Sequence, residues 1–267
     1  MTVACPELLD RDEPAPFAVC NPGGRSPFLL LGDHAGNAIP RRLGTLGLPV
    51  ADRARHIARD IGVRGLGERL AASLDATFIH QPYSRLVIDC NRDPMADDAI
   101  PAVSDGSRIP GNEHLALRER TCRIDAIHQP YHLRIAAEIA GRGQADRATV
   151  VIALHSFAPA MAGIARPWHV GVLYAGGDIR FAAAALGLLA RDDTIRAGDN
   201  QPYAMDETDH TILRHAVTNG LPYAELEVRQ DLVAGPSGQR SWCARLTAVL
   251  NAALGNLLSG RPIGAAS

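Results

Sequence analysis

The chain has 267 residues, of which 46% are hydrophobic and 21% charged, so it can bury a core as one compact unit. Its formal net charge is -2, and no cluster of Lys and Arg marks a face for nucleic acid. Neither a signal-peptide pattern at residues 1–10 nor an apolar run of about 18 residues occurs. These features argue against nucleic-acid and membrane partners.

The five cysteines are odd in number, widely spaced and free of any CxxC pair. This pattern disfavours a disulfide framework and a thiolate zinc site, and it favours a cytoplasmic location. The composition carries no indication of the oligomeric state.

The first part of the chain predicts an arm, a strand and a helix. Residues 1–24 are rich in Pro and acids without periodicity, which indicates an irregular arm ahead of one domain at 25–267. The apolar run at 27–31, followed by a glycine, is typical of a buried strand. Helical spacing of apolar residues covers 51–74, where several glycines weaken the helix and allow a bend.

The middle of the chain predicts two more strands, a long loop and a second helix. The strands are expected at 76–80 and 86–89, with a QPYS turn between them. Residues 94–111 are rich in Pro, Gly and Asp, and a loop of this length is a candidate lid. Residues 113–140 are helical by composition, with an interruption at Pro130.

The last part alternates strands with helices. The run TVVIAL at 149–154 is the clearest buried strand, and His155 ends it. Two further strands and two helices are expected at 168–174, 222–228, 178–190 and 239–258. This alternation predicts a single three-layer α/β/α domain around a mostly parallel or mixed sheet.

Two histidines follow predicted strands. Ligands of open α/β sheets bind at the carboxyl ends of the strands, where loops vary over a rigid base. His34 and His155 lie there, and Asp89, Asn91 and Arg92 follow the strand expected at 86–89. A histidine at such a place has no evident packing role, so we expect both to be functional.

Two neutral imidazoles and one carboxylate form a common catalytic zinc set, in which a fourth position holds water whose pKa the metal lowers to about 7. Here the third ligand stays open. Asp33 would need a sharp turn to share a metal with its neighbour, and Asn37 stands where a carboxylate would complete an HxxE spacing. Asp60 remains, but charged residues are mostly exposed, so by itself it is expected on a helix surface.

Two acids alternate on the strand expected at 222–228. Glu225 and Glu227 point to the same side of this strand as Tyr223. Either acid, if it lay near a metal, could take a proton from water and pass it to a leaving amine. The alternative is an exposed edge strand with salt bridges.

Arginines supply candidate anion-binding groups. Arg85, Arg92 and Arg214 lie beside the predicted strands or turns, and a guanidinium holds a carboxylate through two parallel hydrogen bonds. Each of them could instead form a structural ion pair. Rival chemistries lack their motifs, since the chain has no GxSxG, GxxxxGK[ST] or strand-linked GxGxxG sequence. Cys90 is a weaker candidate nucleophile, because free cysteines are more often packing residues.

Six segments carry a resemblance to the N-formylglutamate amidohydrolase family. They run in order over nearly the whole chain, which makes the match far more specific than any one motif. The segments are GDHAGNAIP at 32–40, HIARDIG at 56–62, YSRLVIDCNR at 83–92, LHSF at 154–157, DNQPY at 199–203 and ELEVRQ at 225–230.

The resemblance implies a fold like that of zinc carboxypeptidases and acylamino-acid deacylases. It implies hydrolysis of N-formyl-L-glutamate to L-glutamate and formate, a late step of histidine breakdown, with one zinc ion per chain. The implied metal ligands are His34, Asp60 and His155, so Asp60 becomes the preferred third ligand. The missing HxxE carboxylate is a departure from the carboxypeptidase pattern.

The resemblance also places the general base at Glu227 rather than Glu225. Asn91 and Arg92 are similar to the carboxylate-binding Asn-Arg pair of those enzymes, and Arg85 and Arg214 are further candidates for the substrate. A small N-acyl amino acid is therefore the expected partner. Two alternatives stay open: a hydrolase of another N-acyl amino acid, and a non-catalytic protein that binds an acidic metabolite.

Overall fold

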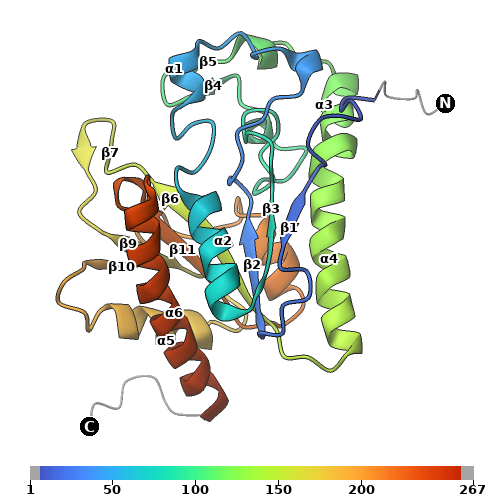
Figure 1. Cartoon of the computed structure of the whole chain (residues 1–267). Helices are drawn as coiled ribbons and strands as arrows, with labels where there is room; N and C mark the ends of the chain where they lie inside the picture. Colours follow the sequence, from blue (N-terminus) through green and yellow to red (C-terminus); the bar gives the residue numbers. More distant parts are fainter. Residues whose placement is uncertain (1–6, 260–267) are drawn as a thin grey trace.

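The computed structural model describes residues 7–259. A mixed seven-stranded sheet forms its centre, in the order β1-β3-β2-β6-β11-β9-β10 (Figure 1). In chain order the strands are β1 (Ala18–Cys20), β2 (Phe28–Gly32), β3 (Thr77–His80), β6 (Val150–Phe157), β9 (Val170–Leu173), β10 (Ala197–Asp199) and β11 (Tyr223–Arg229). The expected mixed sheet is confirmed.

Four neighbouring strands in the middle of the sheet, β3, β2, β6 and β11, run parallel. Strand β1 is antiparallel to β3, and β9 is antiparallel to β11. Every residue of β2 and β6 is buried, as apolar strands covered on both faces should be. The carboxyl ends of β2, β6 and β11 therefore meet at one edge of the sheet.

Helices cover both faces of the sheet and complete the predicted three layers (Figure 1). One face carries α2 (Val63–Leu74), α5 (Arg180–Leu189) and α6 (Pro236–Ser259). The other carries α4 (Gln129–Gln144), which continues from α3 (Leu117–Arg123) through a π-helical turn, and a second π-helical turn at Leu213–Val217. Within residues 7–259, no helix is long and apolar enough to cross a membrane.

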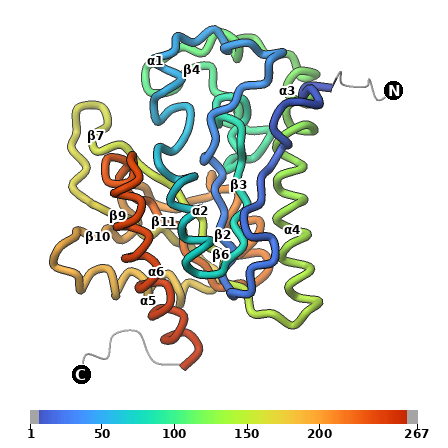
Figure 2. The backbone as a smooth tube through the Cα atoms, in the orientation of Figure 1, coloured from blue at the N-terminus to red at the C-terminus, as the bar shows by residue number. Residues whose placement is uncertain are grey.

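Small elements gather beyond the carboxyl edge of the central strands (Figure 2). The short helix α1 (Val50–Arg53) lies beside the hairpin of β4 (Val103–Ser104) and β5 (Ser107–Arg108), and Arg55 links the two through Asp105. A second hairpin joins β7 (Ala160–Met161) and β8 (Ile164–Ala165). The loop expected at 94–111 thus holds the β4–β5 hairpin.

Two expectations about strands were wrong. Residues 1–6 of the expected arm lie outside the described part, and residues 7–24 are not wholly irregular, because Ala18–Cys20 pairs with β3 and occupies a backbone edge that would otherwise be open. The segment 86–89 is not a strand. Its apolar side chains are buried, but its backbone turns, and the amide of Val87 donates to the carbonyl of Ser84.

Other boundaries differ for local reasons. The helix expected at 51–74 breaks before Gly62, whose φ of 88° suits glycine and whose backbone lies against the carbonyl of Val233. The helical segment runs on through Pro130, which lies at the start of α4 directly after the π-helical turn at Ile124–His128. His155 lies inside β6 rather than after it.

Candidate active site

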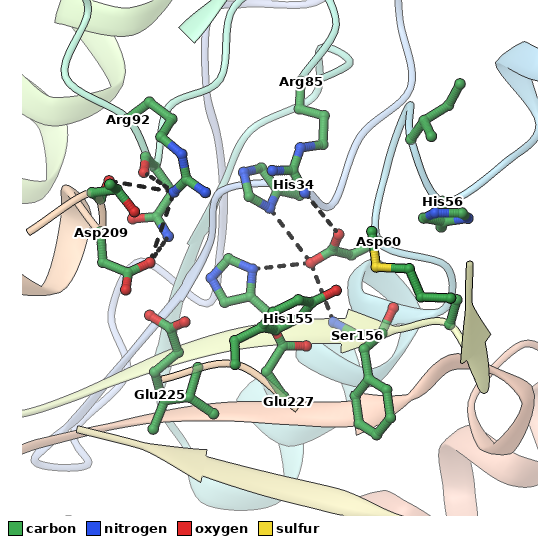
Figure 3. Close-up of a pocket in the computed structure, with 18 of the residues that line it drawn as sticks. His34, His56, Asp60, Arg85, Arg92, His155, Ser156, Asp209, Glu225 and Glu227 are labelled. Atoms are coloured by element: carbon green, nitrogen blue, oxygen red, sulfur yellow. Dashed lines mark hydrogen bonds and ion pairs between the residues drawn. The ribbon is translucent and has the colours of Figure 1, made fainter. Parts of the chain in front are cut away.

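Three buried side chains meet at the carboxyl edge of the sheet (Figure 3). His34 follows β2, His155 lies near the end of β6, and Asp60 precedes α2. The Oδ2 atom of Asp60 lies 2.9 Å from Nδ1 of His155 and 3.5 Å from Nδ1 of His34. All three are at most 5% exposed, so this carboxylate lies between two imidazoles away from solvent.

Close backbone packing brings these residues together. The amide of Asp60 donates to the carbonyl of His34 at 2.9 Å, and the amide of Ser156 donates to Oδ2 of Asp60 at 3.2 Å. Gly36 allows the loop after His34 to press on the next loop, since a Cβ there would lie 2.0 Å from the carbonyl oxygen of Pro82. Close packing therefore requires a glycine at position 36 of the GDHAGNAIP segment.

A second layer of carboxylates supports the two imidazoles. Nε2 of His34 lies 2.6 Å from Oδ1 of Asp89, and Nε2 of His155 lies 3.6 Å from Oδ2 of Asp33. The hydroxyl of Tyr131 donates to Oδ1 of Asp33 at 2.6 Å. Metal-bound histidines in proteins have this arrangement, with the second ring nitrogen directed at a carboxylate.

Arg85 balances the negative charge. Its guanidinium donates to Oδ2 of Asp89 at 3.0 and 2.6 Å and lies 3.8 Å from Oδ1 of Asp60. Burial opposes ionisation of Asp89, but Arg85 and His34 hold the pKa of that carboxyl well below its usual range. The pKa of Asp60 is likewise lowered, because His34 and His155 outweigh the effect of burial. Both carboxylates are ionised.

Glu225 and Glu227 lie on the cavity side of β11 (Figure 3). Glu227 pairs in register with His155, and Glu225 with Ala153, one step further from the strand end. Each glutamate has an Oε2 atom that is buried without a hydrogen-bond partner. Burial raises the pKa of both to about 8, although His155 opposes this rise. The alternative of an exposed edge strand was wrong, since β11 lies between β6 and β9.

These groups line one cavity of about 540 Å³. It brings together all of the predicted site residues except Arg214, and it adds several residues to which the sequence had assigned no role. The predicted residues are His34, Asp60, Arg85, Asn91, Arg92, His155 and Glu227, and the additions include His56, Tyr203 and Asp209. Arg214 does not line this cavity: it is exposed, and its Nη1 atom lies 3.2 Å from Nε2 of His210.

Asn91 and Arg92 have different roles in the structure. Oδ1 of Asn91 accepts from the amides of His210 and Thr211, and its Nδ2 donates to Asp209, so this side chain holds two loops together. Arg92 donates to Asp98 and to a backbone carbonyl while its guanidinium borders the cavity. Of the two, Arg92 can face a substrate anion.

The donors fit a divalent metal ion. One ring nitrogen each of His34 and His155 and one oxygen of Asp60 lie within 4.8 Å of one another, and Nδ1 of His34 is buried without a hydrogen-bond partner. Nitrogen and carboxylate ligands of this kind suit zinc. Asn37 is not part of the set, because it donates to the carbonyl of Arg53 and lies outside this cavity.

The sequence reasoning set aside Asp33 as a ligand and did not assign a role to Asp89. Both lie within the segments that carry the family resemblance, and this was the available signal. Tyr131 and Asp209 come from distant helical and loop segments without a recognisable motif. Only the folded chain brings them to the site.

Known proteins resemble the whole domain. The model of the family described as N-formylglutamate amidohydrolase matches residues 26–234. The crystal structure of gene product Atu2144 from Agrobacterium tumefaciens is 34% identical with a TM-score of 0.90, over 94% of this chain and 99% of that one. N-formylglutamate amidohydrolase from Ralstonia eutropha JMP134 is 20% identical with a TM-score of 0.64, over 90% and 97%. No curated protein matches.

Proposed function

The chain belongs to the N-formylglutamate amidohydrolase family, and we propose that it hydrolyses the amide bond of an N-formyl amino acid, with N-formyl-L-glutamate as the first candidate. One observation carries this proposal. The pair of histidines, Asp60 and Glu227 share one cavity, with Glu227 in register with His155. Products would be L-glutamate and formate.

We propose one zinc ion per chain, held by His34, Asp60 and His155. Bound there, it would polarise the amide carbonyl and make a water molecule more acidic. The carboxylates of Asp89 and Asp33 fix which ring nitrogen of each histidine faces inward. Arg85 holds Asp89 in place and so acts as a positioning residue.

Glu227 is the proposed general base. Its carboxylate takes the proton from water as the water oxygen bonds to the formyl carbon, and it returns that proton to the amine nitrogen as the carbon–nitrogen bond breaks. Its buried, unpartnered Oε2 atom in the cavity supports this role. Arg92 is the proposed partner of a substrate carboxylate, with Asn91 holding its loop.

Formate release from a substrate panel tests the proposal. We expect the highest kcat/KM with N-formyl-L-glutamate, and lower values with N-formyl-L-methionine and N-acetyl-L-glutamate. Chelation should abolish turnover and zinc should restore it. His155→Ala should lose both turnover and the metal.

Full activity after chelation would contradict the metal role. A better rate on another N-acyl amino acid would favour the related-hydrolase alternative. Ligand-induced stabilisation without turnover, and without metal in the purified protein, would favour a non-catalytic binder. A cytoplasmic location and a place in histidine breakdown stay predictions.

A further inference from the structure

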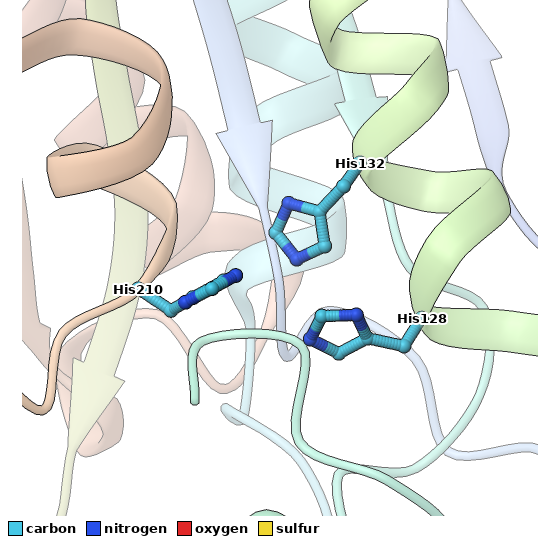
Figure 4. A group of neighbouring side chains, drawn as sticks. All are labelled: His128, His132 and His210. Carbon is cyan, nitrogen blue, oxygen red and sulfur yellow. The ribbon is translucent and has the colours of Figure 1, made fainter. Parts of the chain in front are cut away.

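A second cluster of histidines is shown in Figure 4, and two of its members contact the loop that carries Asn91 and Arg92. His128 ends the π-helical turn before α4, His132 lies four residues later in the first turns of α4, and His210 faces them from another segment. Their ring centroids lie 4.4 to 5.4 Å apart, and one ring nitrogen of each lies within 4.8 Å of the others. Three ring nitrogens therefore lie close enough together to converge on one ion.

The cluster is built to stay neutral. Burial lowers the pKa of His128 to about 4 and holds that of His132 well below its usual range. Burial and the nearby Arg214 also lower the pKa of His210. Neutral imidazole is the form that ligates metals. His210 is only partly buried, so one side of the cluster stays open to an incoming ion.

Outer partners are already in place. Nδ1 of His132 lies 2.8 Å from Nε2 of His215, and its Nε2 lies 2.9 Å from the carbonyl oxygen of Cys90. Both ring nitrogens of His132 hold hydrogen bonds in the metal-free structure, so an ion would displace one of these two bonds, and the other would then orient the ring. Nε2 of His128 similarly lies 3.1 Å from the carbonyl oxygen of Arg92. Such outer hydrogen bonds orient ligating histidines.

We propose that His128, His132 and His210 bind a second divalent transition-metal ion, separate from the one proposed for the catalytic cavity. Three imidazoles suit zinc and its neighbours cobalt, nickel and copper rather than magnesium or calcium, which prefer oxygen. The amide of His210 donates to Oδ1 of Asn91, so an ion here would stiffen the loop that presents Arg92. We therefore expect this second ion to have a structural role, in which it stabilises the loop that forms part of the cavity wall.

Metal counting on the full chain tests this proposal. After chelation and titration with Zn²⁺, we expect about two bound equivalents in the wild type and about one in His155→Ala. His210→Gln, at the partly exposed position, should also bind about one, and the double variant none. His114→Asn, on the exposed surface, is the matched control and should keep both.

Arg214→Gln should have the opposite effect on the affinity for the second ion. The guanidinium of Arg214 lies beside His210 and repels a cation, so its removal should tighten binding of the second Zn²⁺ several-fold. Circular dichroism should show that His210→Gln and Arg214→Gln stay folded. The cluster is only a hydrogen-bonded network if the wild type binds a single ion that His155→Ala removes, or if His210→Gln keeps both ions. One ion that persists in His155→Ala but not in His210→Gln would support the cluster while contradicting the catalytic site.

Discussion

Two glutamates face the same cavity, and their register with β6 separates their roles. Glu227 lies beside His155, whereas Glu225 lies beside Ala153. Glu227→Gln keeps the shape of the side chain but cannot accept a proton. We expect kcat to fall by about 10²- to 10⁴-fold in formate release, with the metal content unchanged.

Glu225→Gln is the control for this loss, since it removes a carboxylate from the same strand face. A smaller effect on kcat is expected for it. Equal losses of kcat in the two variants would mean that the position of Glu227 beside His155 does not determine which glutamate acts as the base.

Arg92 is the cationic side chain proposed to meet the substrate carboxylate. Arg92→Gln should raise KM for N-formyl-L-glutamate by about 10- to 100-fold and change kcat less, because it removes an ion pair present in both the bound substrate and the transition state. Steady-state kinetics measure the changes in KM and kcat separately. The exposed Arg180→Gln should change neither constant. A fall in kcat at unchanged KM would instead give Arg92 a role in the chemical step.

At the scale of elements, apolar patterning predicted the buried strands well and the polar connections poorly. Strands β2 and β6 are runs of apolar residues buried on both faces, so composition alone identifies them. The segment 86–89 has the same composition, yet it forms a turn, because its side chains fill the core while its backbone bonds to loops. An apolar composition indicates that a segment is buried, but it does not distinguish a hydrogen-bonded β-strand from a buried turn.

That turn carries Asp89, which holds His34 and Arg85 together. Asp89→Asn would keep its size and lose its charge, so His34 would be less firmly oriented and a weaker ligand. We expect zinc affinity to fall by about 10- to 100-fold, measured by competition with a chromogenic chelator. Asp98→Asn, which loosens only the pairing of Arg92, should keep the affinity. An unchanged affinity in Asp89→Asn would separate this carboxylate from the metal site.

Strand β9 illustrates how a glycine shapes the cavity wall. A Cβ on Gly171 would lie 1.8 Å from the carbonyl oxygen of Gln201, so the backbone leading to Tyr203 crosses directly over this strand. Gly171→Ala should lower the free energy of unfolding by about 1–3 kcal/mol and move the wall beside Glu227, with reduced kcat/KM. Urea denaturation and kinetics measure both effects. Gly187→Ala, on a helix with open space, is the control and should be stable. A stable, fully active Gly171→Ala variant would show that the backbone at Gln201 can shift without an effect on stability or catalysis.

For the whole molecule, proton binding links the site to stability. Burial raises the pKa of Glu225 and Glu227 to about 8, whereas an unfolded glutamate has a pKa of about 4.3. The folded metal-free chain therefore binds protons more tightly than the unfolded chain. The contribution of these two glutamates to the free energy of unfolding is greatest below the unfolded pKa, and it is lost as pH rises through about 8. The raised pKa of His155, whose neighbouring acids overcome the effect of burial, acts in the same direction.

We expect the Tm of the metal-free protein to fall between about pH 5 and pH 8, and zinc to stabilise the protein most at the upper end of that range. Thermal unfolding at several pH values, with and without zinc, measures this. The double variant Glu225→Gln and Glu227→Gln should flatten the decline. A Tm that rises over this range without metal would contradict the charge balance described here.

The ordered motifs along the chain predicted the family and the layered α/β fold, and both are confirmed. They also led to His34, Asp60, His155 and Glu227, which the fold brings into one cavity. Arg214 could not be judged from the sequence, because its distance from the cavity depends on how the π-helical turn at Leu213–Val217 is placed. Long-range geometry of this kind has no local signature.

Helix α4 contacts both clusters from neighbouring positions. Tyr131 reaches Asp33 behind His155, and His132 belongs to the second histidine cluster. A shift of this one helical turn would move both groups, so an ion that shifted the turn at one cluster would change the affinity of the other. Such heterotropic coupling is reciprocal, and the two affinities must then change by the same factor.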